Sequence, residues 1–78
     1  MKMFESEFVG KTVMSDEGMV LGVLRGVQMN EENGELVNVL VEPAGNIDVR
    51  LYHQDRGYIV FPFGTVKSVR DFVVVGSH

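Results

Sequence analysis

The 78-residue sequence contains no cysteine and no tryptophan, and it has only two histidines and two prolines. The absence of cysteine excludes disulfide bonds, thiolate metal sites and a cysteine nucleophile. Two histidines alone do not make a metal site. A chain of this length buries only about 60–65% of the surface that its unfolded form exposes, so its stability is marginal. With disulfides and a metal set aside, we expect a partner subunit to stabilise the fold.

Basic residues are few and scattered. Seven Lys and Arg stand against eleven Asp and Glu, which gives a formal net charge of -4. Proteins that bind nucleic acids concentrate basic groups in a stripe, because contacts with phosphates supply most of their affinity. The sequence therefore predicts no direct binding to DNA or RNA.

Long apolar runs are also missing. No window reaches the length of a signal peptide or of a membrane-spanning helix. We therefore expect a cytoplasmic protein. The residues Gly76–His78 resemble the remnant of a purification tag, and we leave them out of the functional interpretation, so that residues 1–75 form a single domain.

β-branched and aromatic residues occur in short runs between turn signals, without a sustained helical period. The turn signals are Ser15–Gly18, Asn30–Gly34, Glu42–Asn46 and His53–Gly57. The strands predicted between and after them are Lys11–Met14, Val20–Met29, Glu35–Glu42, Ile47–Tyr52, Tyr58–Phe61 and Phe72–Val75. Six short strands at this spacing predict an all-β barrel or sandwich.

Two positions indicate local irregularities. Alternation along Val20–Met29 changes face near Arg25-Gly26, which predicts a β-bulge, unless both faces of this strand are partly buried. Pro62 cannot donate to a central ladder, so we expect the preceding strand to end there. The following residues, Phe63–Val66, are too few for a strand and predict one helical turn before the step Lys67–Asp71 and the closing strand.

Four sequence segments, taken in order, resemble the PRC-barrel domain family. They are "FVGKTV" at 8–13, "DEGMVLGVL" at 16–24, "EENGEL" at 31–36 and "VFPFGTVKSVRDFVVV" at 60–75. The resemblance covers nearly the whole chain, and it departs from many members at Val23 and Gly26, where polar or acidic residues are common. It implies a six-stranded, mostly antiparallel PRC-type barrel with one short helical turn near the C-terminus.

The resemblance also implies a function. Free-standing PRC-barrels of this length are typical of archaea, and some are dimeric adaptors of cell division. The chain is therefore expected to be a non-enzymatic module that binds itself and another protein, of the division or the ribosome-assembly machinery. The alternative is a ribosome-maturation or RNA-processing accessory, because the family includes the C-terminal domain of the ribosome maturation factor RimM.

A search of the sequence for chemistry finds no catalytic constellation. His53 lies two residues before Asp55 in a predicted loop, where a solvated histidine is more common than a general base or a metal ligand. Glu31, Glu32 and Glu35 lack the spacing of a calcium-binding loop. The glycines are followed by strands rather than by a helix that could hold a phosphate. We therefore expect no enzyme activity, no metal and no cofactor.

The strand Glu35–Glu42 is apolar on both faces, and a small barrel has room inside for one of them. A subunit interface could cover the other face, and so could the segment Met1–Phe8 by folding back. The residues expected near a homodimer contact are Val37, Val39, Val41, Phe61 and Phe63. The residues expected to bind another protein are Tyr52, Tyr58, Arg50 and Arg56. Barrel closure could instead bury Phe61 and Phe63 and leave the two tyrosines as anchors.

Overall fold

The computed structural model describes residues 5–76, which form one seven-stranded sheet with a short helical turn at each of three places. The strand order across the sheet is β4-β5-β3-β2-β1-β7-β6. The elements are α1 (Glu5–Phe8), β1 (Thr12–Ser15), β2 (Val20–Met29), β3 (Leu36–Pro43), the 3₁₀ turn η1 (Val49–Leu51), β4 (Gln54–Asp55), β5 (Tyr58–Pro62), the 3₁₀ turn η2 (Phe63–Thr65), β6 (Val66–Val69) and β7 (Phe72–Val75).

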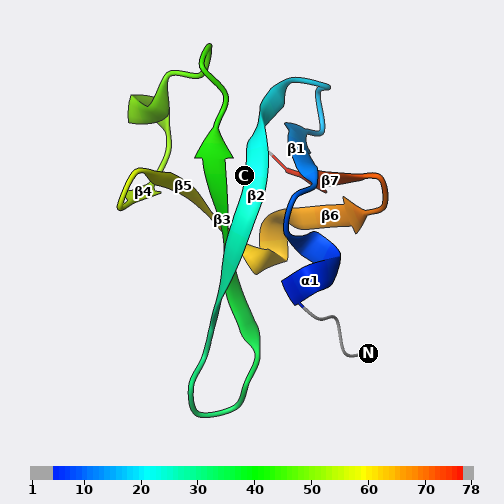
Figure 1. The fold of residues 1–78 in the computed structure, drawn as a ribbon, viewed down its shortest axis with the longest axis vertical. Helices are drawn as coiled ribbons and strands as arrows, with labels where there is room; N and C mark the ends of the chain where they lie inside the picture. Colours follow the sequence, from blue (N-terminus) through cyan, green and yellow to red (C-terminus); the bar gives the residue numbers. More distant parts are fainter. Residues whose placement is uncertain (1–4, 77–78) are drawn as a thin grey trace.

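The long hairpin of β2 and β3 forms the centre of the molecule (Figure 1). Strands β5 and β4 continue the sheet beyond β3, and strands β1, β7 and β6 continue it beyond β2. All strand pairs are antiparallel except β1 and β7, which are parallel. Within residues 5–76, β4 and β6 pair on one side only, so the sheet curls without closing. The predicted all-β, barrel-like fold is confirmed.

A β-bulge at Arg25 lets β2 serve two parts of the sheet. The pairing with β3 passes from Leu24 opposite Val41 to Gly26 opposite Leu40, so Arg25 has no partner of its own. The extra residue resets the alternation. As a result Leu24 is buried and Val27 also packs against the core. The bulge predicted from the sequence is confirmed.

A second irregularity, which the sequence pattern did not indicate, lies at Val37 in β3. The pairing passes from Gln28 opposite Asn38 to Met29 opposite Leu36, and Val37 is left out. Leu36 therefore packs against the core, whereas the side chain of Val37 is 44% exposed. The prediction that Val37 shares one face with Val39 and Val41 is wrong, because it assumed unbroken alternation.

The core is made of ten apolar side chains from α1 and from every strand except β4 and β6. They are Phe8, Val13, Leu21, Leu24, Val39, Val41, Ile59, Phe61, Val73 and Val75. Phe8 is fully buried and meets Phe63 edge to face, with 6.1 Å between the ring centres. The last residue of Met1–Phe8 thus covers the core, while residues 1–4 lie outside the described part of the chain.

The segment Ile47–Tyr52 does not form the predicted strand. Its middle is the 3₁₀ turn η1, with Asp48 as the residue that caps its start. Asp48 Oδ1 accepts a hydrogen bond from the backbone N–H of Arg50 at 3.1 Å, which favours a turn over an extended chain. The alternating apolar residues of this segment do not share one face. Ile47 and Val49 pack against the core, whereas Leu51 is exposed to solvent.

Two short strands replace the missing one, so the sheet has seven strands rather than six. Gln54–Asp55 forms β4 inside the predicted turn His53–Gly57, where Arg56 and Gly57 both have positive φ and make a tight hairpin. Val66–Val69 forms β6 in place of the expected step. A bulge at Lys67 breaks the alternation of β6, which explains why the sequence pattern did not reveal it. The helical turn expected at Phe63–Val66 is confirmed as η2, over Phe63–Thr65.

Gly22 in β2 lies directly against the backbone of β3. A Cβ atom at this position would lie well inside the van der Waals radius of the Glu42 carbonyl oxygen. The obstacle is backbone of β3, which cannot move aside as a side chain can. Only glycine therefore allows β2 to approach β3 so closely at this point.

We predict that Gly22→Ala destabilises the protein by about 3 kcal/mol, because the methyl group forces β2 and β3 apart. Gly45→Ala is the matched control, since a Cβ at Gly45 meets nothing within 4 Å. Urea unfolding followed by circular dichroism measures both variants. Equal stability of the two variants would contradict the role assigned to Gly22.

A second prediction compares two valines of the same strand. Val39 is fully buried, so Val39→Asp places an unpaired carboxylate in the core and should cost more than about 3 kcal/mol, enough to unfold a small domain. Val37→Asp, at the exposed bulge, should change the stability by less than about 1 kcal/mol. Thermal unfolding separates these outcomes, and a folded Val39→Asp variant would show that the burial is wrong.

Candidate functional site

Two hollows lie side by side at the end of the molecule formed by β4, β5 and the chain after η1. They share the residues His53, Val60 and Pro62, which form a common wall. One hollow, of about 460 Å³, is lined by polar side chains and we call it the polar hollow. The other, of about 360 Å³, is mostly apolar and we call it the apolar hollow.

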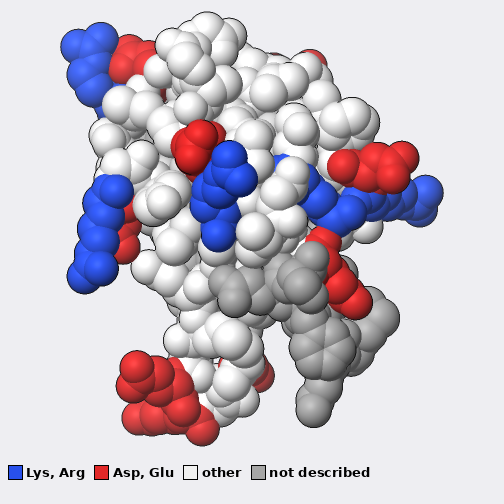
Figure 2. Space-filling view, viewed as in Figure 1, with Lys and Arg blue, Asp and Glu red and all other residues white. Residues whose placement is uncertain are grey.

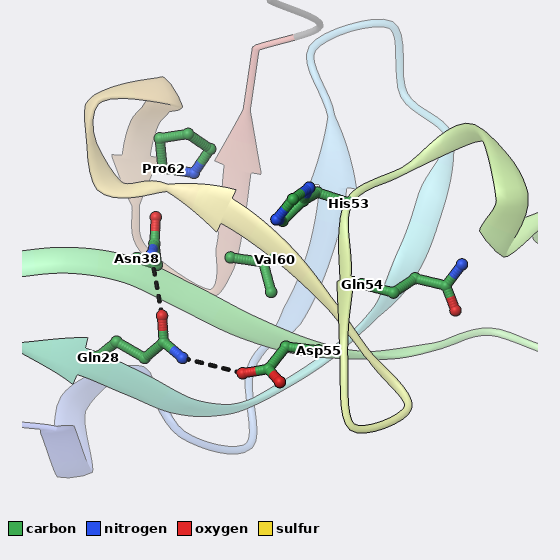
Figure 3. Close-up of a pocket in the computed structure, with 7 residues that line it drawn as sticks. All are labelled: Gln28, Asn38, His53, Gln54, Asp55, Val60 and Pro62. Carbon is green, nitrogen blue, oxygen red and sulfur yellow. Dashed lines mark hydrogen bonds between the residues drawn. The ribbon is translucent and has the colours of Figure 1, made fainter.

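A chain of hydrogen bonds builds the polar hollow (Figure 3). Asn38 Nδ2 donates to Gln28 Oε1 at 2.9 Å, and Gln28 Nε2 donates to Asp55 Oδ2 at 3.2 Å. Gln28 and Asn38 face each other across β2 and β3, so strand pairing holds the two amides in place. The network fixes the Asp55 carboxylate against the sheet, while Gln54 bonds to the carbonyl of Val49 instead.

The apolar hollow lies between β5, the residues 51–53 and the ends of β1 and β7. Its floor contains the core residues Leu21, Phe61 and Val75, and its rim contains Met19 and Leu51. Leu51 is 77% exposed, the highest value among the large apolar side chains of the described chain. The turn η1, which Asp48 caps at its start and which Leu51 ends, places it there.

Of the four residues expected to bind a partner, Tyr52 alone lines one of these two hollows. Tyr52 lines the apolar hollow and packs edge to face on Phe61, with 5.8 Å between ring centres. Tyr58 is half-buried opposite Asp55, and Arg56 lies in the hairpin turn with φ of 53°. Whether these side chains bind a partner stays a prediction.

Arg50 is engaged by its own neighbour. Its Nε and Nη2 donate to the two carboxylate oxygens of Asp48 at 2.9 and 3.0 Å. The pKa of Asp48 is lowered, first by the side chain of Arg50 and then by its backbone N–H, and the pKa of Arg50 is raised by Asp48. A partner carboxylate would have to compete with Asp48, so Arg50 is a weaker candidate than its exposure suggests.

The residues expected at a dimer contact are mostly inside the single chain. Val39 and Val41 are fully buried and Phe61 is 8% exposed, so their side chains are not available to a second subunit. Phe63 is half-buried under Phe8, and Val37 alone of the five is exposed. Assigning Val39, Val41 and Phe61 to a surface is therefore corrected, because the curled sheet takes them as its core.

A different apolar face was missed by the sequence analysis. On the side of β2, β1 and β7 away from the core, Val23, Thr12 and Phe72 form one row and Val20, Met14 and Val74 form the next. We call these six residues the outer face. Phe72 is 49% and Val20 45% exposed. The valine-rich sequence of β7 was a usable signal, since a strand with apolar residues at every position has two apolar sides.

On the face shown in Figure 2, most basic side chains lie beside an acidic one. Arg25 contacts Glu42 at 3.3 Å and Lys67 contacts Asp16 at 2.7 Å, so several basic groups already face a carboxylate. Within residues 5–76, no three His, Asp or Glu side chains come together as metal ligands. None of the helices in that range has the length and apolar character needed to span a membrane.

Comparison with known proteins places this fold. The PRC-barrel domain family matches residues 1–77. No curated protein matches the chain. The crystal structure of a 16S ribosomal RNA processing protein RimM from Pseudomonas aeruginosa is similar, with a TM-score of 0.66 and 18% identity, over 97% of this chain and 44% of that chain.

This chain spans less than half of the length of the RimM protein, and at 18% identity the likeness concerns the fold alone. The family match, by contrast, extends over nearly the whole sequence. The open, curled sheet described above agrees with it. The chain therefore belongs to the PRC-barrel domain family.

Proposed function

We propose that this PRC-barrel protein is a cytoplasmic, non-enzymatic interaction module that forms a homodimer and connects another protein to an assembly. The observation that supports the dimer is the outer face. Its two rows contain five apolar side chains and one threonine, with no charge, across three adjacent strands. Soluble proteins rarely leave such a face uncovered without using it for contact.

A second copy of the chain is the occupant that fits this face best. An isologous contact brings the same patch of both subunits together, so an apolar face covers itself without a special partner. Groups of both signs lie close by, because Glu42 pairs with Val23 at one end of a row and contacts Arg25. A stable dimer of this kind buries roughly 800 Å² per subunit, with the apolar rows at its centre and polar groups at its rim.

A second candidate function is an accessory role in ribosome maturation. It is supported by the structural likeness to a protein described as processing 16S ribosomal RNA. The charges do not favour direct RNA contact. The net charge is -4, and the basic side chains of Arg25, Arg50 and Lys67 are each paired with a carboxylate. In this role the barrel would contact a protein of the assembly.

We predict that sedimentation equilibrium at micromolar concentration gives the mass of a dimer, and that Phe72→Asp gives the mass of a monomer. A charge on the outer face opposes the burial of that face in a dimer. Leu51→Asp is the matched control, since Leu51 is also an exposed apolar residue but lies outside the outer face. Circular dichroism checks that both variants fold. A monomeric wild-type protein at this concentration would sink the dimer.

We also predict that single-stranded and duplex RNA bind more weakly than about 10 µM at physiological salt, near ordinary non-specific affinity. Fluorescence anisotropy with labelled RNA measures this, with a salt titration as the control for electrostatic binding. Tight binding that falls steeply with salt would overturn the prediction and favour direct RNA processing over protein contact.

A further inference from the structure

The polar and the apolar hollow form one composite surface, because His53, Val60 and Pro62 belong to both. The two parts offer different chemistry. One side of the common wall has amide and carboxylate groups, and the other has exposed apolar side chains beside buried core residues. A ligand that fits both parts must itself carry a polar and an apolar group at close spacing.

The charge of the surface has one sign. Among the described residues, the carboxylates that line the hollows are Asp55 on the polar side and Glu17 on the apolar side, and no Lys or Arg lines either hollow. Asp55 Oδ2 is held by Gln28, while Oδ1 has no hydrogen-bond partner within residues 5–76. A positioned carboxylate with a free oxygen is suited to accept a charge-assisted hydrogen bond from a Lys or Arg side chain.

Leu51 supplies the second observation. It is exposed at the rim of the apolar hollow, where it does nothing for the core, and a 3₁₀ turn with a capped start holds it in that position. Tyr52 beside it is fixed by its contact with Phe61. Exposed apolar side chains on fixed backbone, next to a hollow, are typical of anchors for a partner side chain.

We propose that the two hollows bind an extended segment of a partner protein that carries a Lys or Arg two residues from an aliphatic or aromatic side chain. The basic group lies against Asp55 in the polar hollow, and the apolar group lies between Leu51 and Tyr52 in the apolar hollow. Side chains two residues apart in an extended chain point to the same side, as this arrangement requires. The inference rests on the proposed function as an interaction module, and it names the chemistry of the second partner.

Side chains rather than strand addition make this contact. Strand addition would need free backbone groups on the edge of β5 beside the hollows. That edge is already used or blocked: Val60 N donates to the carbonyl of His53, Pro62 has no N–H, and the carbonyl of Pro62 accepts from Thr65 Oγ1 at 2.7 Å. Specificity therefore comes from the two pockets.

The experiment is a selection of phage-displayed random heptapeptides on the immobilised wild-type protein, with depletion on the Asp55→Asn/Leu51→Ser double variant. We expect the enriched peptides to share a Lys or Arg two positions from Leu, Ile, Val or Phe. The peptide most enriched is then synthesised, and its affinity is measured by fluorescence anisotropy.

Single variants assign the two contacts. Asp55→Asn keeps the acceptor for Gln28 but removes the charge, and it should weaken peptide binding about tenfold. Asp71→Asn removes an exposed carboxylate elsewhere and should leave binding unchanged. Leu51→Ser should weaken binding by a similar factor, whereas Met29→Ser, at an exposed apolar residue on another strand end, should not.

The proposal is overturned if no peptide is enriched, if the enriched peptides lack the basic and apolar pair, or if Asp55→Asn and Leu51→Ser bind as the wild type does. Sedimentation of the same variants keeps this result separate from the dimer. Both hollow variants should remain dimeric, and Phe72→Asp should bind the peptide as a monomer. Loss of the dimer alone, or of peptide binding alone, thus identifies which of the two proposals fails.

Discussion

The close approach of β2 to β3 at Gly22 is the constraint on which the rest of the structure depends. It brings the backbone of β2 against the Glu42 carbonyl and lets the long strand pair closely with its neighbour. Beyond this point, the bulge at Arg25 turns the strand so that its two halves serve different parts of the sheet. The first half of β2 pairs with β1, which in turn pairs with β7. Most of β2 also pairs with β3, which in turn pairs with β5. A small sheet bent in this way encloses a core without closing its edges.

The path of the sheet also determines where the candidate sites lie. Phe61 of β5 and Val75 of β7 form the floor of the apolar hollow. The curl of the sheet likewise turns the far side of β1 and β7 outward as the outer face. The two proposed contacts use different sets of strands, because the outer face belongs to β2, β1 and β7, whereas the polar hollow is lined by residues of β2, β3, β4 and β5.

Much of the fold could be predicted from the sequence, because strand ends coincide with residues whose backbone preferences are strong. Val20–Met29 and Phe72–Val75 were predicted with the observed bounds, and Pro62 marks the end of β5 as expected. The prediction failed where a side chain changed the backbone locally. Asp48 turned an alternating segment into η1, and bulges at Val37 and Lys67 hid the correct faces of β3 and β6. The bulge at Arg25 was indicated by a change of face beside a glycine, whereas Val37 and Lys67 have no glycine next to them.

The candidate site was less accessible to sequence reasoning than the fold. The aromatic and basic residues near the fourth turn were singled out, and Tyr52 does line the apolar hollow. Gln28 and Asn38 were not considered, because an amide on a strand resembles any other solvated polar residue until the pairing register is known. The hydrogen bond from Gln28 to Asp55 joins residues 27 positions apart. Such a network depends on the tertiary structure.

The parallel pairing of β1 with β7 has a consequence for how the chain folds. It joins Thr12–Ser15 to Phe72–Val75, so one central pair of the sheet connects the two ends of the domain. Closing so long a loop costs conformational entropy before the contact contributes, which slows folding relative to a chain of local hairpins. During synthesis, β1 can pair with β2 but keeps its other edge free until β7 has left the ribosome. Until then, β1 presents an unpaired edge to chaperones and to neighbouring chains.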